Sequence, residues 1–196
     1  MEAEFETSIG TPPHDGESGL QVVVADSDEL QQVCFRLRYE VYAENRGWEG
    51  ENPNRKETDP FDQYSEHALV FIDGLAVATV RVVFNQGGPL PCHLLCGGET
   101  SASAEISRFA YARQLLPTYR RDVITFLLKA SVALCRERQA TTVAAFMEPA
   151  LIRRLRVLGV CPESVQEPIT FKGQPRVLCA MAVSDLAYAV EKIQVH

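Results

Sequence analysis

Several charged residues of this chain stand inside segments that are otherwise apolar. Arg81 lies within ATVRVVF, and Glu105 and Arg108 lie within AEISRFAY. Burying an unpaired charge is costly, so each of these side chains needs a partner near the core. Such a group of charges favours a polar pocket in which a carboxylate acts as an acid or a base. The alternative is a structural network of salt bridges, which gathers the same residue types without catalysis.

Further charged residues come earlier in the chain. Ser27 is a typical helix cap, and the residues after it carry apolar side chains at helical spacing. Arg38 and Tyr42 lie on the flank of that apolar stripe, from which they can reach the edge of a core. Asp59 and Asp62 follow in a long polar segment, and long ordered loops are often functional. The stripe consists of Leu30, Val33, Cys34, Leu37 and Val41.

The order of the expected elements indicates the fold class. Residues 1–19 are acidic and rich in turn formers, which predicts a mobile tail before a single domain over residues 20–196. Strands then alternate with helices, after an early hairpin about Asp73-Gly74. This order predicts an α/β fold with a mixed, mostly antiparallel sheet flanked by helices on both faces. The strands are expected at 21–25, 67–72, 75–84, 104–111, 141–147 and 176–183, and the helices at 27–41, 122–135, 148–159 and the end of the chain.

Composition excludes several classes of protein. The chain is 46% hydrophobic, too apolar for a disordered protein. No apolar run approaches the roughly 20 residues of a membrane helix, and the first residues lack the features of a secretory signal. We therefore expect a cytoplasmic protein without a membrane span, in which six scattered cysteines are reduced thiols. Cys92, His93 and Cys96 are potential zinc ligands, but no second pair lies nearby, so we expect no metal site.

Charge is distributed unevenly along the chain. Residues 1–100 carry 18 acids against 6 bases, whereas residues 101–176 carry 12 bases against 6 acids. A basic half on an acidic protein suggests an anionic partner. Nucleic acid is not expected, because no zinc-finger, basic-helix or aromatic RNA-binding motif accompanies the bases. A solvated charged face is the alternative.

The candidate residues also form a pattern as a set. Arg38 is followed by an aromatic residue four positions later and by Trp48 ten positions later, and the two aspartates have D-x-x-D spacing. Arg81 and the E-x-S-R-F run of residues 105–109 come next. This set resembles the signature of acyl-homoserine-lactone synthases, a branch of the GCN5-related N-acetyltransferase (GNAT) superfamily. The resemblance covers about residues 30–112, and the rest of the chain is similar only in element order.

One feature departs from the lactone synthases. There the strand arginine usually opens a leucine-leucine-proline-threonine run, whereas Arg81 precedes Val82-Val83-Phe84-Asn85. The segments FRLRYEVYAENRGWE and ATVRVV are more similar to long-chain N-acyl amino acid synthases and to acyltransferases associated with exosortase systems. The departure argues against S-adenosylmethionine as the acceptor and leaves acyl transfer as the implied reaction.

The resemblance also bears on the acyl donor. Superfamily members that use coenzyme A carry a glycine-containing loop whose amides bind pyrophosphate at a helix start. The corresponding segment here, AYARQLLPTYRRD, has no glycine. We therefore expect no permanently bound cofactor and an acyl-phosphopantetheine delivered on acyl carrier protein, which is small and acidic. The candidate docking residues are Arg120, Arg121, Arg153, Arg154 and Arg156.

Acyl transfer to an amine requires proton removal, attack on a thioester carbonyl and stabilisation of an oxyanion. The resemblance assigns the base to Glu105, directly or through a water, with Ser107 and Arg108 beside it and backbone N–H groups of residues 105–111 at the oxyanion. Strand alternation places Arg108 opposite the other two, so a bulge is needed if all three serve one pocket. The arginines would hold an acceptor carboxylate or order the aspartates, and the aromatics would wall the pocket or simply pack in the loop. The candidate acceptor-binding residues are Arg38, Tyr42, Trp48, Asp59, Asp62, Arg81 and Phe109.

The sequence thus predicts an N-acyltransferase that moves a fatty acyl chain from acyl carrier protein to the amine of an amino acid or related small molecule. A lactone-forming synthase that uses S-adenosylmethionine is the alternative within the superfamily. A non-catalytic module that binds an acyl chain or docks a partner is the alternative from another class. An acceptor site built from the charged residues requires Arg38 and Arg108 to lie on the same side of the protein.

Overall fold

The computed structural model describes residues 8–9, 19–96 and 100–194. The strands are β1 Ser8–Ile9, β2 Leu20–Val24, β3 Ser65–Ile72, β4 Leu75–Phe84, β5 Ala104–Tyr111, β6 Thr142–Met147, β7 Glu163–Ser164, β8 Ile169–Phe171 and β9 Gln174–Ala182. The helices are α1 Asp28–Tyr39, α2 Pro91–Cys96, α3 Arg120–Glu137, α4 Pro149–Val157 and α5 Val183–Glu191. A π-helix, η1 Glu40–Asn45, and two 3₁₀ turns, η2 Pro60–Tyr64 and η3 Pro117–Tyr119, complete the helical elements of the described residues.

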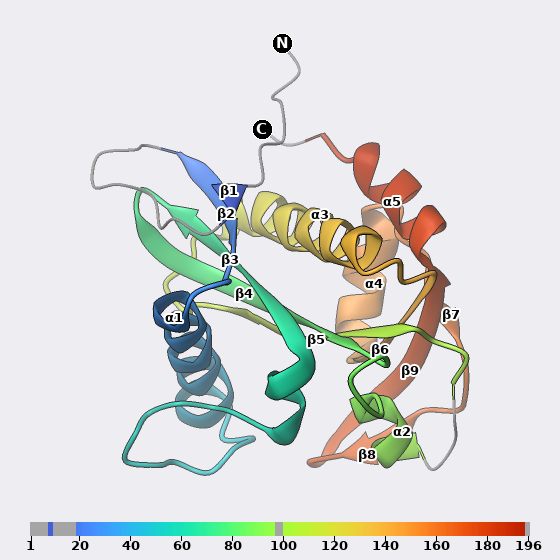
Figure 1. Ribbon diagram of the computed structural model, residues 1–196, viewed down its shortest axis with the longest axis horizontal. Helices are drawn as coiled ribbons and strands as arrows, with labels where there is room; N and C mark the ends of the chain where they lie inside the picture. The colour runs from blue at the N-terminus through green and yellow to red at the C-terminus, as the bar shows by residue number, and fades with distance from the viewer. Residues whose placement is uncertain (1–7, 10–18, 97–99, 195–196) are drawn as a thin grey trace. The chain divides into compact units, whose positions relative to one another are not determined.

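The strands form a mixed, mostly antiparallel sheet that helices flank (Figure 1). Their order is β1-β2-β3-β4-β5-β6-β9-β7, and β8 pairs with β9. The pairs β1–β2 and β5–β6 are parallel, whereas β2–β3, β6–β9, β7–β9 and β8–β9 are antiparallel. The predicted α/β fold class is confirmed.

The chain divides into two compact units. β4, β5 and α3 each contribute residues to both of them. Of the predicted tail, only Ser8–Ile9 and Gly19 belong to the described residues, and Ser8–Ile9 form a parallel strand beside β2. The first unit comprises residues 1–58, 66–80 and 108–130, and the second comprises residues 59–65, 81–107 and 131–196.

The core of the first unit forms where α1 packs on β2 and β3. Ser27 caps α1, as predicted, by accepting a hydrogen bond from the amide of Leu30 at 3.3 Å. Cys34 and Phe35 of the helix meet Val23 and Leu69 of the strands. Asp73 and Gly74 both have positive φ, which gives the β3–β4 hairpin its two-residue turn. The predicted helix and hairpin are both present.

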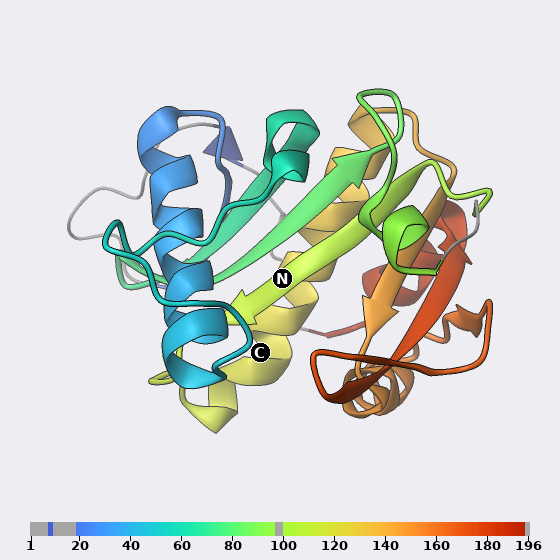
Figure 2. The ribbon, with the colours of Figure 1, turned by 90° about the horizontal axis from the view of Figure 1, so that it is seen from below.

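The core of the second unit lies on β6 and β9, which run side by side (Figure 2). Both α4 and α5 pack on β9. An apolar cluster joins Val83 of β4 and Leu178 of β9 to Leu90 and Cys92 of the segment around α2.

Of the cysteines in the described part of the chain, Cys34, Cys92, Cys135 and Cys179 are buried and Cys161 is exposed.

Two segments in which the sequence predicted neither a strand nor a helix contain short helices. Residues 44–66 include η2, and residues 85–102 include α2. The sequence analysis missed both, because neither helix is long enough to show an apolar period. Each begins at a proline, Pro60 or Pro91, which suits the first position of a helix. The short strands β7 and β8 escaped prediction for the same reason of length.

Gly87 makes a close approach that glycine alone tolerates. A Cβ at this position would lie 2.4 Å from the Cβ of Tyr64, whose hydroxyl donates to the Pro89 carbonyl at 2.9 Å. We expect Gly87→Ala to lower the free energy of unfolding by roughly 1–3 kcal/mol in urea titrations. Gly50→Ala is the matched control, because nothing lies within 4 Å of a Cβ there. Equal midpoints for the two variants would contradict the packing described.

Candidate functional site

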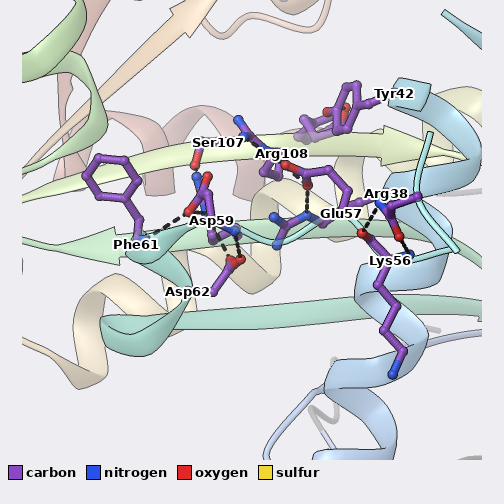
Figure 3. A network of polar contacts seen from close by, with 12 residues as sticks. Arg38, Tyr42, Lys56, Glu57, Asp59, Phe61, Asp62, Ser107 and Arg108 are labelled. Atoms are coloured by element: carbon purple, nitrogen blue, oxygen red, sulfur yellow. Dashed lines mark hydrogen bonds and ion pairs between the residues drawn. The ribbon is translucent and has the colours of Figure 1, made fainter. Parts of the chain in front are cut away.

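Glu57 is the centre of a buried charge cluster in the first unit (Figure 3). Arg38 Nε donates to its Oε2 at 2.5 Å. Arg108 Nε donates to Oε1 at 3.0 Å and to Oε2 at 3.2 Å, and its Nη2 lies 2.9 Å from Oε1. The side chains are 0% exposed for Arg38, 6% for Glu57 and 27% for Arg108. Two guanidiniums thus bind the one carboxylate of Glu57.

The protonation of Glu57 reflects a balance of burial and charge. Burial alone would raise the pKa of the carboxyl, but Arg38 and then Arg108, through charge and hydrogen bonds, outweigh burial and lower that pKa. The amide of Glu57 donates to the Phe35 carbonyl at 3.0 Å, which ties the loop to α1. The carboxylate therefore stays ionised at neutral pH between its two arginines.

Arg81 is the centre of a second charge cluster, in the second unit. Its Nη1 donates to Asp59 Oδ1 at 2.6 Å and to Asp62 Oδ1 at 2.9 Å, and its Nε donates to Ser107 Oγ at 3.1 Å. The arginine is fully buried, and the two aspartates are 18% and 9% exposed. Two carboxylates and the Ser107 hydroxyl thus bind this one guanidinium.

The D-x-x-D spacing has a local cause. Asp59 is the N-cap of η2, and its Oδ1 accepts from the amide of Phe61 at 2.9 Å. Asp62 Oδ2 accepts in return from the amide of Asp59 at 2.8 Å, which completes a capping box. Both carboxylates also accept hydrogen bonds from Arg81. The motif thus prepares two carboxylates for one arginine.

Arg108 interrupts the regular backbone of β5. Its φ is +51°, in the left-handed region that residues other than glycine seldom adopt. One residue later, the carbonyl of Phe109 accepts a hydrogen bond from the Tyr42 hydroxyl at 3.1 Å. From the sequence we expected that Glu105, Ser107 and Arg108 could serve one pocket only if β5 breaks the regular alternation of side chains. The positive φ of Arg108 is a break in the regular strand backbone at this point.

Aromatic and guanidinium groups pack around Tyr42. Its ring stacks with that of Trp48, with centroids 5.8 Å apart and planes at 16°. The Arg46 guanidinium lies 4.3 Å from the centroid of the Trp48 ring, and the Arg108 guanidinium lies 5.8 Å from that of Tyr42. Burial raises the pKa of Tyr42 against the lowering effect of Arg108, so the phenol is protonated at neutral pH. Tyr42 lies in the π-helix η1, a type of element frequent at functional sites.

Glu105 is a buried carboxylate on β5, 2% exposed. Its Oε2 accepts from the amide of Cys92, in the first turn of α2, at 2.6 Å. The parallel register of β5 with β6 joins Ala104 to Val143 and Glu105 to Ala144. Glu105 therefore stands at the end of this paired stretch with its carboxylate oriented by a backbone N–H.

The structure groups the predicted residues differently from the sequence. Arg38 and Arg108 share one carboxylate, so they lie on the same side of the first unit, as a charged cluster required. Arg38 and Arg108 pair with Glu57, and Arg81 pairs with both aspartates. That the three arginines hold an acceptor carboxylate or order the aspartates stays a prediction. The sequence analysis missed Glu57. Glu57 could have been found as the acid two positions before Asp59, in a loop that the sequence analysis already considered functional.

The candidate docking arginines lie on two helices. Arg120 and Arg121 begin α3, where the Arg120 guanidinium lies 5.7 Å from the centroid of the Tyr111 ring. Arg153, Arg154 and Arg156 are exposed on α4 in the second unit.

Other possible sites among the described residues are few. No group of three or more His, Cys, Asp and Glu within the described part of the chain is arranged to hold a metal ion. None of the described helices is both long and apolar enough to cross a membrane. An open depression of about 500 Å³ in the first unit is lined by Tyr39, Glu44, Glu51, Asn52, Pro53 and Arg55, none of which the sequence analysis selected.

Comparison with known families agrees with this geometry. Residues 37–118 match the sequence model of the acetyltransferase (GNAT) domain, a span that includes both charge clusters and Glu105. Over these residues the chain is similar to the GNAT acetyltransferase domain. The predicted acyltransferase class is therefore confirmed. No curated protein matches the chain in sequence.

Solved structures show that the GNAT fold extends over most of the chain. TofI, in a ternary complex with an inhibitor and MTA, has a TM-score of 0.74 at 20% identity, over 87% of this chain and 96% of that chain. BjaI, a CoA-dependent acyl-homoserine lactone synthase with SAM and isopentyl-CoA, has a TM-score of 0.70 at 18% identity, over 89% and 90%. FeeM, an N-acyl amino acid synthase from uncultured soil microbes, has a TM-score of 0.66 at 13% identity, over 87% and 94%.

Proposed function

We propose that the chain transfers a fatty acyl chain from acyl carrier protein to the amine of an amino acid or related small molecule. The observation that carries the proposal is Glu105, a buried carboxylate held at the end of the β5–β6 pairing within a GNAT domain. In the reaction the amine loses a proton and attacks the thioester carbonyl. An amide N–C bond forms, the C–S bond breaks, and the carrier's thiol leaves with a proton.

Glu105 is the proposed general base. The hydrogen bond from the Cys92 amide fixes the direction of its carboxylate and so reduces the reorganisation needed when a proton arrives. Ser107 and the left-handed Arg108 follow on the same strand, and backbone N–H groups of β5 are the proposed oxyanion donors. This assignment keeps the base and the oxyanion contacts on one strand.

Arg108 is the proposed contact for an acceptor carboxylate. Arg38 and Arg81 are fully buried, whereas Arg108 is 27% exposed, so part of its side chain is accessible to a ligand. Among the described residues Arg81 Nη2 has no hydrogen-bond partner. This buried N–H donor is therefore a further candidate to bind an oxygen of the acceptor. The similarity in fold to FeeM, an N-acyl amino acid synthase, supports an amino acid acceptor. The remaining proposed acceptor-binding residues are Tyr42, Trp48, Asp59, Asp62 and Phe109.

Acyl carrier protein is the proposed donor. The segment of residues 110–122 has no glycine with which to approach a pyrophosphate, and arginines stand at the start of α3 and along α4. BjaI is CoA-dependent, so acyl-coenzyme A is the donor against which the proposal must be tested.

We expect acylated carrier protein to support turnover and acyl-coenzyme A to be a poor substitute. The affinity for carrier protein should fall as salt rises, because exposed charges are screened over about 10 Å at 0.1 M ionic strength. Reversing Arg153 and Arg156 to glutamate should weaken the affinity and its salt dependence. Lys192→Glu, at the C-cap of α5, is the control. Efficient use of acyl-coenzyme A without any response to carrier protein would contradict this proposal.

Lactone formation is the second candidate. The similarity in fold to TofI and to BjaI, a lactone synthase bound to SAM, favours it. The two reactions differ in their products, because a lactone synthase releases methylthioadenosine from S-adenosylmethionine. Mass spectrometry of reactions containing acylated carrier protein, the amino acids and S-adenosylmethionine separates the two. An N-acyl amino acid without methylthioadenosine supports our proposal, and methylthioadenosine with a lactone overturns it.

A further inference from the structure

The left-handed backbone of Arg108 must be held by its surroundings. A positive φ brings Cβ too close to the backbone in an L-residue, and an isolated arginine gains nothing in return. Such conformations persist where neighbouring contacts over-determine them, and they gather at functional sites. Arg108 has contacts of this kind on both sides, all within the first unit.

The side chain of Arg108 is held by Glu57. Its Nε and Nη2 contact both carboxylate oxygens, and the same carboxylate accepts from the buried Arg38. This pairing fixes where the guanidinium lies. It does not fix the backbone that follows, because an arginine side chain has enough rotatable bonds to reach Glu57 from more than one backbone conformation.

The backbone after Arg108 is held by Tyr42. Its hydroxyl donates to the Phe109 carbonyl at 3.1 Å, and its ring stacks on Trp48 and lies 5.8 Å from the guanidinium of Arg108. These ring contacts orient the hydroxyl toward the carbonyl. The amide of Ala112 donates to the Val77 carbonyl at 2.8 Å and holds the strand three residues further on.

We infer that Tyr42 is a positioning residue, whose hydroxyl fixes the left-handed turn of β5 at Arg108 through the Phe109 carbonyl. The inference rests on the proposed function in one respect, since it is β5 that carries the proposed base and oxyanion donors. This role requires the hydroxyl and not merely the aromatic ring. It therefore differs from walling the acceptor pocket, which the ring alone could do.

The test compares Tyr42→Phe with Tyr39→Phe in the full-length protein. Tyr39 is a buried tyrosine of α1, whose hydroxyl accepts at 3.3 Å from the amide of Asn52, in the loop after η1. Hydrogen–deuterium exchange of peptides spanning residues 104–111 reports on the strand. The loss of one hydrogen bond should speed exchange there about fivefold in Tyr42→Phe and not in Tyr39→Phe.

Turnover is measured with long-chain acylated carrier protein and a mixture of the twenty amino acids. We expect kcat of Tyr42→Phe to fall roughly ten- to a hundredfold with KM for the donor unchanged, because misplaced catalytic groups affect the chemical step. Tyr39→Phe should keep both constants.

Equal exchange in the two variants would overturn the inference. So would faster exchange in Tyr42→Phe with wild-type kcat, because Tyr42 would then order the strand without serving the reaction. If the wild-type protein transfers no acyl group, the proposed function fails. The exchange comparison then still supports or overturns the role of Tyr42 in holding β5.

Discussion

Replacing Glu57 with alanine is expected to destabilise the protein by roughly 3–5 kcal/mol, because it leaves the guanidiniums of a buried ion-pair cluster without their carboxylate. The cost of losing the carboxylate is greater for Arg38 than for Arg108, because the Arg38 side chain is fully buried. Urea denaturation followed by circular dichroism measures the effect. Glu51→Ala is the matched control, because Glu51 is an exposed acid of the same loop and should change stability by less than about 0.5 kcal/mol.

The pH dependence of stability tests the same cluster. The arginines lower the pKa of Glu57 in the folded state below its ordinary value of 4.5, so the folded protein binds the proton less readily than the unfolded chain does. The resulting stabilisation is fully present above pH 4.5 and is lost as the pH falls through the folded-state pKa. The stability difference between wild type and Glu57→Gln should therefore shrink in acid. A difference that stays constant over this window would contradict the pairing.

Glu105→Gln is expected to lower turnover by roughly 10²–10⁴-fold, the usual loss when a general base is removed. The fold should survive, because the amide oxygen of glutamine can still accept from the Cys92 amide that the carboxylate binds at 2.6 Å. Initial rates with acylated carrier protein, together with thermal denaturation, measure both effects. Glu163→Gln is the control, because Glu163 is an exposed acid of the second unit.

Glu105→Ala separates catalysis from structure. Alanine removes both the proton acceptor and the partner of the Cys92 amide, so it should lower stability as well as turnover. If Glu105 only holds α2, the glutamine variant will turn over normally while the alanine variant loses stability. Near-normal turnover of Glu105→Gln would thus remove Glu105 from the role of base.

Short-range features of the site could be read from the sequence because their partners lie a few residues apart. Ser27 caps α1 through an amide three residues away, as predicted. Asp59 and Asp62, both selected from the sequence, cap η2 through each other, although that turn itself was not predicted. For contacts this short, the spacing in the chain determines which groups can meet in the structure. The alternation of strands and helices likewise predicted the fold class, and the motif set implied the GNAT superfamily.

The partners of the arginines were decided by tertiary structure. Glu57 and Arg108 are 51 positions apart, and the acidic half of the chain offers 18 carboxylates to any buried arginine. No local rule selects Glu57 among them, since the choice depends on how the loop after η1 returns to α1 through the Glu57 amide and the Phe35 carbonyl. Arg38, which the helical wheel placed at the edge of the core, is fully buried for the same reason.

The left-handed conformation of Arg108 is the feature that the sequence alone was least able to predict. Nothing in the sequence A-E-I-S-R-F-A-Y marks one residue for positive φ, and an arginine is a poor choice for it. Glu57 binds its side chain, and the inferred role of Tyr42 is to hold the backbone through the following carbonyl. The sequence by itself determined which residue types are present and which elements carry them. Long-range contacts determined how β5 turns, because only they can offset the local preference of the backbone.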